Sequence, residues 1–332
     1  MLELLQEIDH VRLNFSEEGR HLLNITIAFI MFGVALELSL DDFKRLIKSP
    51  KPALVGIFSQ FIALPLLTFL LAISLKDYIT PTVGLGMILV ASCPGGNVSN
   101  FISSLARGNI ALSVSLTAFS SVSGLIMTPL NFAFWGNLFM KVYSSSSNPD
   151  LVPNLEINPL SVLETIVIIL GIPLVLGIFF KNKFPKTTSK IVVTIKRLSI
   201  GIFITLLFVL FFKNYDYFVQ YIKYIFLIVL VHNLIALSSG FYLGKLFKLA
   251  KRECKTISIE TGIQNSGLAL ALLFNPRIFP EDLAVGGMAF IAGWWGLWHI
   301  LSGLTIAGIW SGFSLKPKED RLQTEYASSD NH

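Results

Sequence analysis

The stretch Ile259–Leu270, which reads IETGIQNSGLAL, places polar residues inside a segment that is otherwise apolar enough to cross a membrane. Within seven positions it holds Glu260, Thr261, Gln264, Asn265 and Ser266, and the glycines Gly262 and Gly267 accompany them. A carboxylate at membrane depth costs about 2.5–3.5 kcal/mol on insertion scales, so it is retained where it has a partner. The sequence therefore predicts a partner for Glu260.

The composition of the 332-residue chain is that of a helical membrane protein. Hydrophobic residues make up 53% of it and charged residues only 14%, whereas charged residues are about 25% of a soluble domain. The two cysteines provide no disulfide framework. The net charge of +5 indicates no nucleic-acid partner, because the basic residues follow a membrane topology. We expect an all-α polytopic membrane protein.

Nine segments are predicted transmembrane helices, each of which needs about 20 mostly apolar residues. They are Leu22–Leu40, Ala53–Leu75, Thr82–Leu105, Ile110–Phe139, Ser161–Phe180, Leu198–Phe212, Tyr224–Phe247, Lys251–Phe274 and Leu283–Phe313. A polar loop around residues 144–159 divides them into four and five. We expect an N-terminal segment at residues 1–20, a transmembrane domain at 21–315 and a polar tail at 316–332.

The positions of lysine and arginine predict the orientation, because short cytoplasmic loops collect these residues. With the N-terminus outside, 19 of the 26 lysines and arginines lie on the cytoplasmic side. Residues 1–20 are acidic and lack the apolar run of a cleavable signal. We expect a multi-pass protein of the cell (inner) membrane, with residues 1–20 extracytoplasmic and the tail cytoplasmic.

Two of the nine segments are irregular. In the third, Pro94 has no amide donor and two glycines follow it, so a continuous helix is not expected there. The eighth holds only Gly262 and Gly267 among its polar residues, which leaves its break open. Interrupted spans at corresponding places in two halves of a chain are a sequence indicator of a transporter binding site.

The polar residues of these spans supply oxygen ligands of the kind that hard cations prefer. Glu260 and Gln264 are four residues apart, as are Ser113 and Thr117, so each pair shares a helix face. Further oxygens come from Gln60, Ser99 and Asn100. A site with one carboxylate becomes neutral when Na⁺ binds, whereas Ca²⁺ leaves a buried positive charge. The pattern favours a monovalent cation.

Each of these residues also has a structural interpretation. Ser113 and Thr117 are of the type that bonds to the carbonyls of its own helix, and Gln60 is compatible with a helix–helix contact. Glu260 lies five residues from Lys255, so reaching toward the membrane interface is an alternative for it. The functional interpretation is favoured for Glu260, and the structural one for His299 and His232.

Sequence motifs of several enzyme classes are absent. The chain has no G-x-x-x-x-G-K-[ST] segment, no H-E-x-x-H and no G-x-S-x-G. An enzyme is therefore not expected.

Two stretches resemble the crossover motifs of the bile acid:sodium symporter family. They are ASCPGGNVSNFISSLARGNIALSVSLT, which begins at Ala91, and IETGIQNSGLALAL, which begins at Ile259. FIMFGVALELSLDDF and FSQFIALP resemble that family's opening helices, and WHILSG its last one. The resemblance implies an inverted-repeat fold with core and panel domains and two broken, crossing helices. The first repeat is then about residues 21–140 and the second about 160–313.

The resemblance also implies the site residues. One sodium site falls on Ser99, Asn100, Ser113, Thr117 and Glu260. The other falls on Gln60, Glu260, Gln264 and the backbone carbonyls of Thr261 and Ile263. The substrate contacts fall on Asn97, Asn265 and His299.

The chain departs from the family pattern in three ways. Many bacterial members have ten helices, whereas residues 1–20 leave no room here for the extra first one. Ile300 stands where bacterial relatives commonly have asparagine, and Asn97 where a small hydroxyl residue is frequent. The last two leave the substrate open.

We therefore expect a symporter in which two Na⁺ ions drive the uptake of an organic anion, such as a bile acid, pantoate or a related carboxylate. Its partners are then that anion and the lipid bilayer, and no protein partner is inferred. Proton-coupled or exchange transport is the alternative within transporters. An ion channel and a ligand sensor are alternatives from other classes.

Overall fold

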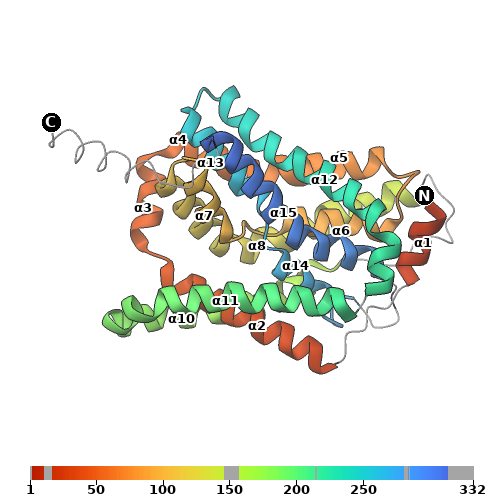
Figure 1. Cartoon of the computed structure of the whole chain (residues 1–332), viewed down its shortest axis with the longest axis horizontal. Helices are drawn as coiled ribbons and strands as arrows, with labels where there is room; N and C mark the ends of the chain where they lie inside the picture. The colour runs from red at the N-terminus through yellow and green to blue at the C-terminus, as the bar shows by residue number, and fades with distance from the viewer. Residues whose placement is uncertain are drawn as a thin grey trace.

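The computed structural model of the chain describes residues 2–10, 17–145, 157–213, 215–279, 283 and 285–312. Within these ranges the chain is helical apart from connecting segments, and the only bridge between extended segments joins Gly95 to Gln264. The all-α prediction is confirmed, as Figure 1 shows. The predicted tail and the centre of the polar loop lie outside the described residues.

Helices occupy all nine segments that the sequence predicts. They are α2 (Glu17–Glu37), the helix Pro50–Ser74, the pair α6 (Pro81–Ser92) and α7 (Val98–Leu105), α8 (Ile110–Ser144), the helix Pro159–Lys183, α11 (Pro185–Lys213), α12 (Tyr215–Leu246), the pair α13 (Lys251–Gly262) and α14 (Ser266–Leu273), and α15 (Gly286–Ser311). Two of these contain a π-helical turn. The turn η1 (Ser59–Ala63) joins α4 (Pro50–Phe58) to α5 (Leu64–Ser74), and η3 (Val167–Gly171) joins α9 (Pro159–Ile166) to α10 (Ile172–Lys183).

Not every helix is long enough to cross a bilayer by itself. Among the described residues, five helices have the length and composition of a membrane span, or six if α2 and the helix after it count as one bent span. The helix α6 has 12 residues, which is about 18 Å against a hydrocarbon core of about 30 Å. The number of nine spans therefore stays a prediction.

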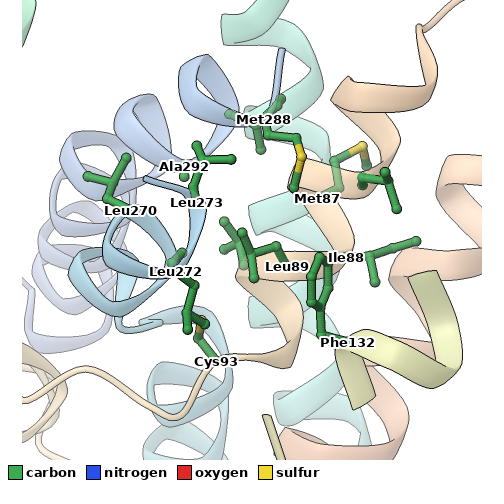
Figure 2. Close-up of a cluster of buried hydrophobic side chains, with 14 of the residues drawn as sticks. Met87, Ile88, Leu89, Cys93, Phe132, Leu270, Leu272, Leu273, Met288 and Ala292 are labelled. Atoms are coloured by element: carbon green, nitrogen blue, oxygen red, sulfur yellow. The ribbon is translucent and has the colours of Figure 1, made fainter. Parts of the chain in front are cut away.

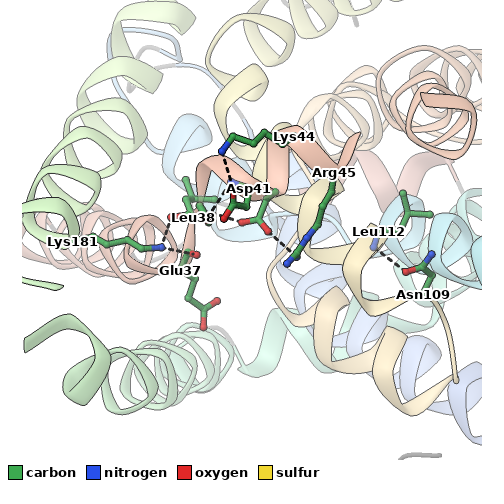
Figure 3. Close-up of polar contacts among 10 residues, drawn as sticks. Glu37, Leu38, Asp41, Lys44, Arg45, Asn109, Leu112 and Lys181 are labelled. Carbon is green, nitrogen blue, oxygen red and sulfur yellow. Dashed lines mark hydrogen bonds and ion pairs between the residues drawn. The ribbon is translucent and has the colours of Figure 1, made fainter. Parts of the chain in front are cut away.

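Two short helices lie outside the predicted segments. The helix α3 (Leu40–Lys48) turns away from α2 by 64°. It begins at a capping box in which Ser39 accepts a hydrogen bond from the amide of Asp41 and Asp42 accepts one from the amide of Ser39. Figure 3 shows this bend, where the ammonium of Lys181 donates to the carbonyls of residues 37 and 38.

The other short helix is α1 (Leu2–His10), which packs against α12 and α15. Its Leu5 and Ile8 are fully buried. The hydroxyl of Tyr221 donates to Glu7 at 2.9 Å, and Thr80 donates to Asp9 at 3.0 Å. Part of the predicted N-terminal segment is thus docked on the helical body, and its extracytoplasmic placement stays a prediction.

The helices form two groups that lie side by side (Figure 1). In one group α2, α10 and α11 pack on one another along the lower side of the view. In the other, α8, α12 and α15 surround the two interrupted pairs, α6 with α7 and α13 with α14. The interrupted pairs are therefore covered by protein.

Apolar packing holds the two interrupted pairs in the interior. Every residue of α6 and every residue of α14 is buried. Figure 2 shows Leu89 of α6 and Leu272 of α14 in one apolar cluster with Phe132 of α8 and Met288 of α15. Non-helical backbone at membrane depth is tolerated where protein surrounds it, and this cluster provides that surrounding next to both breaks.

Candidate cation and substrate site

Both predicted breaks are present. The helix α6 ends at Ser92 and α7 begins at Val98, with the predicted proline, Pro94, between them. The helix α13 ends at Gly262 and α14 begins at Ser266, which settles the break that the sequence leaves open. The side chain of Asn265 accepts a hydrogen bond from the amide of Leu268 at 3.1 Å and so caps α14.

The glycine at the second break has a packing role. Among the described glycines only Gly312 has a positive φ, so Gly262 is not needed there for a left-handed backbone. A Cβ atom on Gly262 would lie 2.3 Å from Cδ2 of Leu237 in α12. Any residue with a Cβ at this position would therefore require the side chain of Leu237 to move.

The two breaks lie side by side and form backbone hydrogen bonds with each other. The amide of Gly96 donates to the carbonyl of Ile263 at 2.8 Å, and the amide of Asn265 donates to the carbonyl of Pro94 at 2.8 Å. Buried backbone groups need such partners where water is absent. Each break thus satisfies groups of the other.

The carboxylate of Glu260 lies at the centre of the first oxygen cluster. Ser113 donates to its Oε1, and Thr117 donates to its Oε2 at 2.9 Å. Both hydroxyls also lie near Oδ1 of Asn100, at 2.9 Å and 3.1 Å, and Oγ of Ser99 is 3.3 Å from Oγ1 of Thr117. The structure therefore brings all five residues of the first predicted sodium site together.

This geometry argues against the purely structural interpretations of Ser113, Thr117 and Glu260. Ser121, on the same helix, bonds back to its own helix at the Thr117 carbonyl, whereas Ser113 and Thr117 turn toward Glu260. The ammonium of Lys255 donates to the carbonyls of Ala106 and Trp310. Within the described residues the ion pairs are Asp41 with Lys44 and Asp42 with Arg45. Glu260 as a whole is 5% exposed, and the hydrogen-bond partners of its carboxylate are the hydroxyls of Ser113 and Thr117.

The second oxygen cluster joins η1 to the second break. Nε2 of Gln60 donates to Oε1 of Gln264 at 2.8 Å and to the carbonyl of Cys93 at 3.0 Å. Nε2 of Gln264 donates to the carbonyl of Thr261 at 2.7 Å. The side chains of Gln60 and Gln264 and the carbonyl of Thr261 are thus neighbours. The carbonyl of Ile263 instead faces Gly96 in the other break.

A π-helical turn places Gln60. The wide turn η1 precedes Pro65, whose ring has no amide hydrogen and clashes with a regular preceding turn. Single π-helical turns occur frequently at functional sites. Here the turn directs Gln60 to the break between α6 and α7, where it donates to the carbonyl of Cys93. Gln60 therefore forms a contact between helices and also lies at the predicted ligand position.

A cavity lies between the two breaks and the helices α2, α11 and α15. Its lining includes the three predicted substrate residues Asn97, Asn265 and His299, together with Met31 and Ser199. Asn97 begins α7 without using its side chain as a cap. The cap on α14 uses the oxygen of Asn265, and the nitrogen of that side chain lies 3.7 Å from the sulfur of Met31.

Several buried polar atoms in this lining have no hydrogen-bond partner among the described residues. They are Oγ of Ser199, Oγ of Ser266 and Nδ1 of His299. Buried polar groups are usually hydrogen-bonded. Ser199 and Ser266 are therefore able to form hydrogen bonds to a ligand in the cavity, in addition to the three predicted residues. Ser266 lies within the polar stretch Ile259–Leu270, whereas Ser199 lies in an apolar span and has no polar neighbours within that span that would indicate a site.

The comparison with known proteins identifies the family. A sequence profile of the sodium bile acid symporter family matches residues 24–221. The chain belongs to this family. Its sequence is 33% identical over 289 residues to the uncharacterized sodium-dependent transporter YocS of Bacillus subtilis, covering 87% of this chain and 83% of YocS.

Other relatives come from plants and animals. The probable sodium/metabolite cotransporter BASS2, chloroplastic, of Oryza sativa is 30% identical over 82% of this chain and 64% of its own length. The human ileal sodium/bile acid cotransporter is 27% identical over 79% of this chain and 71% of its own. These relatives are named as transporters or cotransporters, so membership of the sodium bile acid symporter family confirms that the protein is a membrane transporter and not an enzyme.

Residues that the sequence did not single out also contact the candidate site. The hydroxyl of Ser59 lies 2.8 Å from Oγ1 of Thr261, and Asn233 of α12 donates to the carbonyl of Gly262 at 2.8 Å. The available signal for Asn233 was its position as an amide within an apolar span. Nothing in the local sequence links it to a break about 30 residues later, because only the packing of α12 on α13 brings them together.

Proposed function

We propose that this protein is a secondary active symporter in which two Na⁺ ions drive the import of a small organic anion. The observation that carries the proposal is the buried Glu260 carboxylate, which has hydroxyl partners and no basic partner among the described residues. A buried charge is retained when it is paired or coordinates a metal. Sodium supplies the missing positive charge.

The first sodium ion is assigned to the cluster of Ser99, Asn100, Ser113, Thr117 and Glu260. The second is assigned to Gln60, Gln264, Glu260 and the carbonyls of Thr261 and Ile263. The amides of Gln60 and Gln264 are bonded to each other, so binding of the second ion requires these side chains to turn their oxygens toward it. Glu260 belongs to both assignments, and in this scheme the transported anion balances the positive charge that remains when both ions are bound.

The anion is assigned to the cavity that Asn97, Asn265 and His299 line. The N-termini of α7 and α14 lie at the two breaks, and helix N-termini favour negative charge. In this scheme α2, α11 and the helix Pro159–Lys183, which includes α10, form the panel, and the helices around the two breaks form the core. Nine spans, inverted repeats at residues 21–140 and 160–313, and an inner-membrane location with the N-terminus outside belong to the same proposal.

The substrate class extends from bile acids to small hydroxy or keto acids such as pantoate. Relatives are named for bile acid and for metabolite cotransport, so the family does not select one. A thermal-shift screen of organic anions on the purified protein, with NaCl or choline chloride, identifies the substrate. The symport proposal expects a Na⁺-dependent stabilisation by the bound anion.

The decisive experiment is uptake into proteoliposomes with external Na⁺ replaced by choline at fixed pH. We expect uptake of the identified anion to require Na⁺. Uptake that persists in choline and follows a pH gradient assigns the coupling ion as H⁺, since a buried carboxylate accepts a proton as well as sodium. Conductance without substrate in electrical recordings identifies a channel instead.

A further inference from the structure

Asn233 of α12 is a buried amide to which the sodium proposal gives no role. The side chain is 0% exposed. Its Nδ2 donates to the carbonyl oxygen of Gly262 at 2.8 Å, and its Oδ1 accepts a hydrogen bond from Oγ of Ser302 in α15 at 2.5 Å. The nitrogen and the oxygen of the Asn233 amide are therefore both hydrogen-bonded, and these two bonds connect the second break to α15.

Asn233 donates to the carbonyl of Gly262, which lies between the carbonyls of Thr261 and Ile263 in the chain. The Thr261 carbonyl accepts a hydrogen bond from Gln264, and the Ile263 carbonyl accepts one from Gly96. Carbonyls at the end of a helix have no intrahelical partner, so these external donors fix their directions. Because Thr261 and Ile263 are the assigned carbonyl ligands, the Gly262 peptide between them sets the relative orientation of both.

The helix that carries Asn233 is packed tightly on α13. A Cβ atom on Gly240 of α12 would lie 2.6 Å from the carbonyl oxygen of Ile257, and Ser258 donates to the carbonyl of Leu237 at 2.6 Å. These contacts hold α12 in place against the half-helix that ends at the break. The position of the Asn233 amide is therefore fixed relative to Gly262.

The other end of the connection reaches the substrate cavity. Ser302 lies one turn after His299, whose carbonyl oxygen is 3.1 Å from the Ser302 hydroxyl. That hydroxyl has one proton, and the shorter contact is the one to Asn233. Since His299 lines the cavity, the chain from Gly262 through Asn233 and Ser302 ends on the helix that forms one cavity wall.

We propose that Asn233 is a positioning residue for the sodium site and that, through Ser302, it couples occupancy of that site to α15. The inference rests on the proposed function, because it requires sodium at the break. An ion that draws the carbonyls of residues 261 and 263 toward itself rotates the Gly262 peptide and changes its bond to Asn233. Ser302 passes this change to α15. A coupling of this kind is reciprocal, so a ligand against α15 also raises sodium affinity.

The test uses hydrogen–deuterium exchange of the full-length protein in nanodiscs, with Na⁺ alone as the probe and choline as its replacement. In the unmodified protein we expect Na⁺ to slow exchange in residues 259–268 and in residues 297–305. Ser302→Ala is expected to keep the first protection, with the same Na⁺ midpoint, and to lose the second. Asn233→Ala is expected to raise the midpoint about tenfold, as removal of a group that orients a metal ligand does.

The controls are hydroxyls that bond only to their own helix. Ser239 on α12 donates to the carbonyl of Ala236, and the exposed Thr305 on α15 donates to that of Leu301. Ser239→Ala and Thr305→Ala should behave like the unmodified protein. Ser302→Thr retains the hydroxyl and should restore protection of residues 297–305. If Asn233→Ala does not fold, the Ser302→Ala and Ser302→Thr pair decides.

The outcomes separate the two proposals. If Na⁺ protects both segments in the unmodified protein and equally in Ser302→Ala and Asn233→Ala, the role of Asn233 is overturned while the sodium proposal stands. Loss of protection at both segments in Ser302→Ala also overturns it, because that pattern indicates a general structural defect. Absence of any Na⁺ effect at residues 259–268 in the unmodified protein overturns the sodium proposal and this inference together.

Discussion

The amide of Gly96 donates a hydrogen bond to the carbonyl oxygen of Ile263 at 2.8 Å, which joins two breaks that are far apart in the sequence. Asn265 returns the contact by donating to the carbonyl of Pro94 at 2.8 Å. The pair satisfies backbone groups that have no water nearby. It also means that a displacement of one break displaces the other, so both halves of the chain contribute to a single site.

Gly96→Val is expected to force the two breaks apart. A Cβ atom at this position would lie 3.0 Å from the carbonyl oxygen of Gln264 and 3.3 Å from its carbonyl carbon. Overpacking of this kind costs about 1–3 kcal/mol, and here the obstructing atoms are backbone. We expect a lower melting temperature and a Na⁺ midpoint raised about tenfold in a thermal-shift titration.

The control for this prediction is Gly201→Val in α11, where a Cβ atom has no heavy-atom neighbour within 4 Å. It should leave the Na⁺ midpoint unchanged. A Gly96→Val protein with an unaltered midpoint would show that contact between the breaks does not set sodium affinity.

Ser113→Ala and Thr117→Val are each expected to weaken sodium binding without abolishing folding. Each removes one hydroxyl that contacts Glu260 and Asn100. Loss of a hydrogen bond to a charged group is worth about 1.5–3 kcal/mol, so the Na⁺ concentration for half-maximal uptake should rise about tenfold or more while the maximal rate changes little.

Ser123→Ala is the matched control for the hydroxyl variants, because Ser123 lies on the same helix and donates to the carbonyl of Phe119. Its Na⁺ dependence should equal that of the unmodified protein. An equal rise in all three variants would assign the effect to α8 as a whole and contradict a specific role for Ser113 and Thr117.

The sequence predicts the helices of this protein better than the arrangement of its site. Long apolar runs place helices in all nine segments, yet α3 is missed because Leu40 reads as the end of an apolar run. The spacing of Ser39 and Asp42, which form the capping box of α3, is the sequence signal that marks this helix start. The spacing of Ser113 and Thr117 predicts that they share a face, but which face meets Glu260 depends on how α8 packs against α13.

The second break shows the same limit. Gly262 indicates a break, but the structure gives it ordinary backbone angles and a close neighbour in Leu237. The interruption is stabilised by hydrogen bonds from Gly96 and Asn233, which are distant from it in the sequence. The side chain of Gln264, which lies inside the interruption, folds back to donate to the carbonyl of Thr261. No local propensity encodes such contacts, which is why the glycine pattern alone left the break open.

Glu260→Gln is expected to abolish Na⁺-dependent uptake. The substitution keeps the volume of the side chain and removes the buried charge that the proposal gives to both ions. Removing one partner of a buried charge pair costs about 3–5 kcal/mol, so the loss should exceed about 100-fold in a proteoliposome assay. Glu164→Gln removes an exposed carboxylate of α9 and should transport normally.

Transport in choline across a range of pH, measured for the unmodified protein and for Glu260→Gln, distinguishes the two coupling ions. If H⁺ is the coupling ion, the unmodified protein transports in choline and the variant loses its response to pH. If Na⁺ is the coupling ion, the unmodified protein is inactive in choline at every pH tested. Full Na⁺-dependent transport by Glu260→Gln would refute the assignment of this carboxylate.

Gly262→Ala is expected to destabilise the second break through a clash that a second substitution relieves. The added Cβ would lie 2.3 Å from Cδ2 and 2.6 Å from Cγ of Leu237, and both atoms are removed in Leu237→Ala. The single variant should lose about 1–3 kcal/mol of stability and bind Na⁺ more weakly. The double variant should recover part of both, so that the two changes are not additive. Thermal unfolding with and without Na⁺ measures both quantities. If the double variant is as impaired as the sum of its parts, the requirement for glycine at 262 does not come from α12.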